Sequence, residues 1–143
     1  MSELKRIVER SGGIIETFQV DETGSKQGVS VRTFENGKPW LISYYQNGFL
    51  HGEFIELHED GYIREHSMYS NGKQCGEMVL KRDDRVVRHE IWYSAELVHT
   101  FMYLGSIFCE PTEETKFEMT LKYGTKWLPK RTYEELSAEF EQS

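Results

Sequence analysis

Polar and apolar positions alternate along much of the chain, in short segments that lie between recurring Asn-Gly and Asp-Gly dipeptides. Typical segments are residues 29–34, 40–45 and 62–69, which are six to eight residues long. Alternation with a period of two places successive side chains on opposite faces of a strand, and this is an ordinary strand length. Asn-Gly and Asp-Gly favour hairpin turns because both residues tolerate positive φ. The first two thirds of the chain are therefore predicted to form antiparallel hairpins.

The hairpins recur every 24 residues, because several columns of similar residues share that spacing. The columns are Gly28, Gly52 and Gly76; Tyr45, Tyr69 and Tyr93; Tyr44, Met68 and Trp92; and Val31, Ile55 and Val79. Rows 28–51, 52–75 and 76–99 fit well, whereas row 4–27 keeps only the turn glycines and weak apolar columns. A period of this length indicates a repeat architecture. We predict a mainly all-β fold, a single-sheet antiparallel β-meander of 24-residue hairpin units.

The columns also predict which side chains share a face of the sheet. Ile42, His66 and Glu90 should lie on one face, and Ser43, Ser67 and Ile91 on the other face with the tyrosine column. The strand-start glycines leave room for an aromatic ring across the backbone, and Tyr45, Tyr69 and Tyr93 are the candidates. The pattern departs from the repeat at residues 84–85 and 94–96, which leaves the regularity of the third hairpin open.

The last third of the chain lacks the repeat and is predicted to close the sheet. Residues 97–104 are strongly apolar and residues 116–123 alternate, so each is expected to form a strand, with a loop between them at 110–114. Thr132 and Glu135 have the spacing of a capping box, which predicts a helix over 133–141. Residues 97–143 are thus the closing segment of one domain that spans 1–143.

The motif Tyr-x-x-Asn-Gly-x-x-x-Gly, with Asp-Gly or Asn-Gly partner turns, resembles MORN repeats. The closest likeness is to the variant repeats of bacterial YwqK-like antitoxin proteins. The resemblance covers about residues 28–99 well and 4–27 weakly, and it does not cover the C-terminal third. It implies the hairpin architecture and a binding role as a scaffold, a lipid or membrane-surface binder, or an antitoxin or immunity protein.

Composition narrows the class of protein. The 143 residues suit one domain, with a formal net charge of −7 and a pI near 5.3. The surplus of acidic residues begins after residue 50, which argues against a non-specific nucleic-acid binder and permits a basic protein partner. Two cysteines without a Cys-x-x-Cys pair, no signal-like N-terminus and no long apolar segment predict a cytoplasmic protein without a membrane span. A small acidic chain of this kind also resembles bacteriophage or mobile-element proteins.

Candidate catalytic chemistry does not assemble from the sequence. The histidines are scattered over different segments, so no metal site is expected, and no phosphate loop or nucleophile–histidine spacing occurs. The column alignment places His66 beside Glu56 and Glu90. We therefore predict a protein that is not an enzyme and that has no cofactor.

The function that we predict is a non-enzymatic interaction module, an inhibitor or antitoxin-like or phage-encoded counter-defence protein that masks a basic surface of a partner in a bacterial or infected host cell. For the aromatic candidates, cross-strand packing is an equally open interpretation. The candidate contact residues are Trp40, Tyr44, Glu53, Glu56, Glu59, Asp60, Arg64, His66, Arg88 and Trp92. The alternatives are a scaffold that binds lipid head groups at a membrane surface, and an assembly component that pairs with its own copies through open sheet edges.

Overall fold

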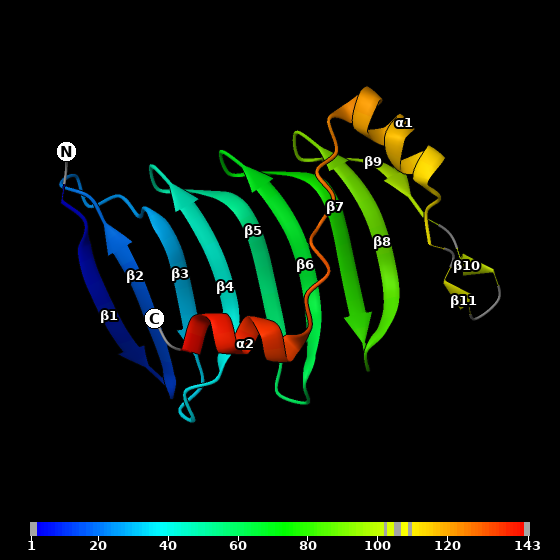
Figure 1. Cartoon of the computed structure of the whole chain (residues 1–143). Coiled ribbons are helices and arrows are strands. Elements are labelled where there is room, and N and C mark those ends of the chain that lie inside the picture. Colours follow the sequence, from blue (N-terminus) through cyan, green and yellow to red (C-terminus); the bar gives the residue numbers. More distant parts are fainter. Residues whose placement is uncertain (1–2, 102, 105–106, 109, 142–143) are drawn as a thin grey trace.

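A computed structural model of the chain describes residues 3–101, 103–104, 107–108 and 110–141. Nine strands form one open antiparallel sheet in chain order, which confirms the predicted meander (Figure 1). The strands are β1 (Lys5–Ser11), β2 (Ile14–Val20), β3 (Gly28–Thr33), β4 (Pro39–Gln46), β5 (Phe49–His58), β6 (Tyr62–Ser70), β7 (Lys73–Arg82), β8 (Arg85–Tyr93) and β9 (Glu96–Thr100). A separate small hairpin pairs β10 (Tyr103–Leu104) with β11 (Ile107–Phe108).

Two helices follow the sheet, α1 (Glu113–Tyr123) and α2 (Tyr133–Glu141). The bounds of α2 agree with the predicted helix, and the Oγ1 of Thr132 accepts a hydrogen bond from the N–H of Glu135 at 3.1 Å. The prediction of a single buried strand over 97–104 is wrong, because β9 ends at Thr100 and residues 103–104 belong to β10.

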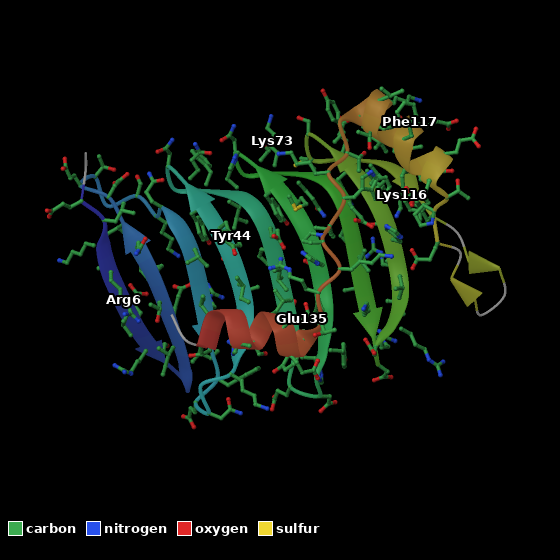
Figure 2. All side chains as sticks on the ribbon, in the orientation of Figure 1. Arg6, Tyr44, Lys73, Lys116, Phe117 and Glu135 are labelled. Atoms are coloured by element: carbon green, nitrogen blue, oxygen red, sulfur yellow. The ribbon has the colours of Figure 1, made fainter. Side chains whose placement is uncertain are left out.

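The prediction of a strand over 116–123 is also wrong, because α1 occupies that stretch. Thr112 caps its start by accepting the N–H of Thr115, and Gly124 ends it in the left-handed conformation at φ 64°. The alternating apolar residues divide between two sides of this helix. Phe117 and Leu121 lie on the exposed side, 64% and 72% accessible, which is why the alternation is misleading here (Figure 2).

After α1 the chain crosses one face of the sheet and ends in α2, which lies across the middle of that face (Figure 1). We call residues 124–132 the strap, this face the covered face, and the opposite one the open face. Along the covered face, Val31, Ile42, Ile55, His66, Val79 and His89 are successive cross-strand partners from β3 to β8. The apolar core lies here, where Tyr133 and Leu136 of α2 pack on the cluster around Ile42 and Ile55.

The third hairpin is out of step with the 24-residue columns because its turn is one residue shorter. Three residues, 59–61, join β5 to β6, whereas only Asp83 and Asp84 join β7 to β8, with φ of 51° and 59°. A shift of one residue moves every side chain of a strand to the other face. His89 therefore takes the position predicted for Glu90, and Trp92 that predicted for Tyr93.

Ile91 is consequently on the covered face and fully buried, so its predicted place beside Ser43 and Ser67 is wrong. The strand-start glycines also differ from expectation. A Cβ at Gly52 would lie 3.3 Å from the Cβ of Tyr44, and one at Gly76 would lie 3.1 Å from the carbonyl oxygen of Lys126. Tyr45 and Tyr69 are the direct cross-strand partners of Gly28 and Gly52, whereas Trp92 rather than Tyr93 is the partner of Gly76. The side chain of Tyr44 and the strap backbone approach the Cβ positions of Gly52 and Gly76.

Candidate functional site

Two glutamate–histidine pairs lie on the covered face, one in each of two successive hairpins. His66 Nε2 lies 2.8 Å from the Oε2 of Glu53, and His89 Nε2 lies 2.7 Å from the Oε1 of Glu77. The glutamates are 24 residues apart and the histidines 23, because of the short turn at residues 83–84. We call these the Glu–His pairs.

The Glu–His pairs hold the strap against the sheet. The guanidinium of Arg131 donates a hydrogen bond to the Oε2 of Glu53, and the N–H of Leu128 donates to the Oε2 of Glu77 at 2.6 Å. The backbone N–H of Glu77 also donates to the carbonyl oxygen of Lys126 at 3.3 Å. Sequence positions more than 50 residues apart are thus joined through carboxylates.

The environment of Glu53 favours its charged form. The hydrogen bond from His66 is the main cause that lowers the pKa of Glu53, and the positive charge of Arg131 acts in the same direction, although burial opposes both. The prediction that His66 lies beside Glu56 and Glu90 is wrong, because both glutamates are on the open face and Glu53 is its partner.

A cavity of about 350 Å³ lies between the strap and strands β6–β8. Both histidines of the Glu–His pairs line it. Its other walls come from three cations, two carboxylates, five apolar residues and one threonine: Lys81, Lys130, Arg131, Glu77, Glu110, Ile63, Val79, Val86, Leu128, Pro129 and Thr132. The cavity therefore joins polar groups from the repeats to a segment that the repeats do not include.

Three of the ten predicted contact residues lie on the covered face. Glu53 and His66 belong to the Glu–His pairs, and Tyr44 packs against the apolar core. Trp40 is the unpaired residue of a β-bulge between β3 and β4, with its ring centroid 6.0 Å from that of Phe34. Glu53, His66 and Tyr44 therefore do not belong to the open face, whereas the ring of the partly buried Trp40 lies 5.9 Å from the guanidinium carbon of Arg32.

The remaining predicted residues lie on the open face or at its border. Glu56, Arg88 and Trp92 are on the open face, and Arg64, at the bulge of β6, has its guanidinium 3.4 Å from the Oε1 of Glu56. Glu59 and Asp60 are exposed in the turn that joins β5 to β6. The sequence-derived set is thus divided between two faces rather than gathered into one site.

The open face carries a row of aromatic side chains that brings together two members of the tyrosine column, the predicted contact residue Trp92 and two phenylalanines that were not predicted as contacts. We call Phe18, Tyr45, Phe54, Tyr69 and Trp92 the aromatic stripe. The rings of Phe54 and Tyr69 are 5.7 Å apart, and the ammonium of Lys26 lies over those of Phe18 and Tyr45 at 4.5 and 4.9 Å. The tyrosine column was the available signal for this stripe.

Carboxylates lie beside the aromatic stripe. Glu56 and Glu65 are direct cross-strand partners, and like charges in that position repel each other. Burial is the main cause that raises the pKa of Glu65, and the charge of Glu56 adds to it. The buried Glu90 is held by Arg88 at 2.9 Å. The open face therefore combines buried and half-buried aromatics with carboxylates that are not all well neutralised.

Within the described ranges, no three histidine, cysteine, aspartate or glutamate side chains gather closely enough to hold a metal ion. No helix in the part of the chain that the structure describes is long and apolar enough to cross a membrane. Comparison with known proteins gives no match to a family model, a curated protein or a solved structure.

Proposed function

We propose that the chain is a non-enzymatic protein-binding module whose open face receives a partner protein with a basic surface, in the manner of an inhibitor or antitoxin. The observation that carries this proposal is the aromatic stripe on a sheet face that neither helix covers (Figure 1). Phe18 of the stripe is buried, whereas its other four side chains are partly exposed. Aromatic side chains are enriched at the centre of protein interfaces, because they bury a large area for few rotatable bonds.

The carboxylates of the open face support a basic partner. Burial, and after it the charge of Glu56, raises the pKa of Glu65, and a cation brought close to both glutamates would favour their charged forms. Two exposed acidic turns, at residues 59–60 and 83–84, border the sheet at one end and extend the negative potential around it. The contact set of the proposal is therefore Trp92, Glu56, Arg64, Arg88, Glu59 and Asp60, extended by the rest of the aromatic stripe.

The resemblance to MORN-type and YwqK-like antitoxin repeats supports the same proposal. A protein of this kind would act in a bacterial or phage-infected cell. The two alternatives make different demands. A membrane-surface binder needs a cluster of cations, which the open face lacks as a set because its cations alternate with carboxylates. An assembly of identical copies would use the edge strands β1 and β9 rather than the aromatic stripe.

The test places a photo-crosslinking benzoylphenylalanine at position 92 or at position 93 of the full chain in its source cells. These adjacent residues point to opposite faces, and the exposed Tyr93 ring lies 6.2 Å from that of Tyr123 on α1. We expect a basic protein to be crosslinked from position 92 and not from position 93. Equal crosslinking from both positions, or none from position 92, would contradict the proposal.

Two further measurements separate the alternatives. Flotation of the purified chain with anionic vesicles would favour the membrane-surface reading, and a concentration-dependent mass in light scattering would favour self-assembly. Once the partner is identified, Trp92→Ala should weaken the binding of that partner by roughly tenfold or more, as for an interface aromatic that contributes over 1 kcal/mol. Tyr93→Ala is the matched control and should leave binding unchanged.

A further inference from the structure

The cavity under the strap differs in charge from the rest of the protein. The chain has a formal net charge of −7, yet three permanent cations and two histidines line this one hollow against two carboxylates. One of those carboxylates, Glu77, already accepts hydrogen bonds on both of its oxygens. Glu53, whose Oε2 is bonded to both Arg131 and His66, offsets the positive charge there, so Lys81 and Lys130 are the cations of the cavity that an anionic ligand would meet.

The cations reach the cavity from separate elements. Lys81 comes from β7, and Lys130 and Arg131 come from the strap. The ammonium of Lys81 is 3.7 Å from an oxygen of the exposed Asp84, which is a weak surface pairing. Lys130 is an exposed residue that also lines the cavity. Lysine ammonium groups on flexible stems can turn toward a phosphate that enters between them.

The size and the walls of the cavity restrict the kind of anion. A volume of about 350 Å³ is at the lower end of the range for small-molecule sites. Five apolar residues line it in addition to the charged ones. Such walls suit a molecule that has a charged group and an apolar or planar part, and the space is too small for a folded partner.

The Glu–His pairs place polar groups at this cavity. In the hairpin formed by β3 and β4, Val29 and Ile42 occupy the positions that correspond to Glu53 and His66. An apolar pair therefore fits this place in the repeat. A buried ionic pair contributes little more stability than an apolar pair of similar volume. The glutamates of the pairs hold the strap, and the two histidines also line the cavity, where they would contact a ligand.

We propose that this cavity binds a small organic phosphate of the size of a nucleoside monophosphate. Lys81 and Lys130 hold the phosphate beside the two imidazoles, and the planar part lies against the apolar wall. The site is on the covered face, so it is separate from the protein-binding surface on the open face and does not depend on it.

The test is calorimetric titration of the full chain at neutral pH and low salt, with adenosine monophosphate as the probe. Inorganic phosphate and adenosine are the comparison ligands. We expect saturable one-to-one binding of the monophosphate, weaker binding of phosphate and none of adenosine. Lys81→Ala and Lys130→Ala should each weaken binding by about tenfold, the usual loss for a charge-assisted hydrogen bond.

Lys73→Ala is the matched control, because Lys73 is exposed at the start of β7, at the other end of the sheet from α2 (Figure 2). Its affinity should equal that of the unaltered chain. Ring-proton shifts of His66 and His89 on titration should follow the calorimetric saturation. The proposal is overturned by no saturable binding of the monophosphate, by binding that Lys81→Ala and Lys130→Ala leave unchanged, or by an equal loss in Lys73→Ala.

Discussion

Replacement of Glu77 by alanine tests whether the Glu–His pairs hold the strap in place. The carboxylate is buried and receives hydrogen bonds at 2.7 Å from His89 and at 2.6 Å from the N–H of Leu128. Hydrogen bonds to a charged group contribute about 1.5–3 kcal/mol each, and truncation also leaves two donors without that acceptor. We therefore expect Glu77→Ala to lower the free energy of unfolding by about 3–5 kcal/mol, the range for breaking a buried pair.

Urea unfolding at neutral pH, followed by far-UV circular dichroism, measures this loss. Glu77→Gln keeps one carbonyl oxygen as an acceptor, so its loss should be about half as large. Glu96→Ala is the control, because Glu96 is exposed at the start of β9, and its effect should stay within about 0.5 kcal/mol. A loss below about 1 kcal/mol in Glu77→Ala would refute the reasoning, because the strap would then be held by other contacts.

Three further outcomes follow from the contacts described above. Because His66 lowers the pKa of Glu53 from its ordinary 4.5, the pair stabilises the fold above pH 4.5 and loses that contribution as the pH falls through the lowered pKa. Glu53→Gln should therefore flatten the acid limb of a plot of urea midpoint against pH. The effect of pH at Glu65 is the opposite. Its pKa is raised above 4.5, so its ionisation lowers stability as the pH rises through that raised pKa. Glu65→Gln should therefore raise the melting temperature at neutral pH but not below pH 4. Gly76→Ala should cost about 2–3 kcal/mol, since it combines a left-handed φ of 72° with the approach of the strap backbone at 3.1 Å. Gly37 has a φ of 85° and nothing within 4 Å of its Cβ position, so Gly37→Ala measures the backbone strain alone and should cost about 1–2 kcal/mol. Equal losses of unfolding free energy at the two glycines, measured by urea unfolding, would show that the strap does not constrain Gly76.

The sequence predicts the sheet well because its signals are local. Alternation, turn dipeptides and a fixed period each act within one hairpin, and a meander needs little more than neighbours along the chain. The capping signal at Thr132 is local in the same sense, and it places α2 correctly. In α1 two local signals conflict. The cap at Thr112 and the left-handed Gly124 outweigh the alternation between them.

The candidate site could not be predicted in the same way. Glu53 and Glu77 share a column, but His89 leaves the column of His66 because one residue is missing from a turn. A column spacing of 24 residues cannot reveal that the counterpart of His66 is His89, which lies 23 residues away. Arg131 lies 78 positions from Glu53, in a segment without repeats, so no periodic signal joins them.

The strap also changes how this sheet is expected to open. A meander in which each strand contacts only its neighbours would separate gradually from either end, like other linear repeat arrays. The strap and the start of α2 contact strands from β4, at Ile42, to β7, at Glu77. These contacts couple the strands from β4 to β7 into one cooperative unit. The strands β1 and β2 lie outside the strap contacts that join β4 to β7. Amide hydrogen exchange should therefore be fast and local in β1 and β2, and slow and concerted from β4 to β7. Hairpins that are similar in sequence would then differ in the free energy of local unfolding.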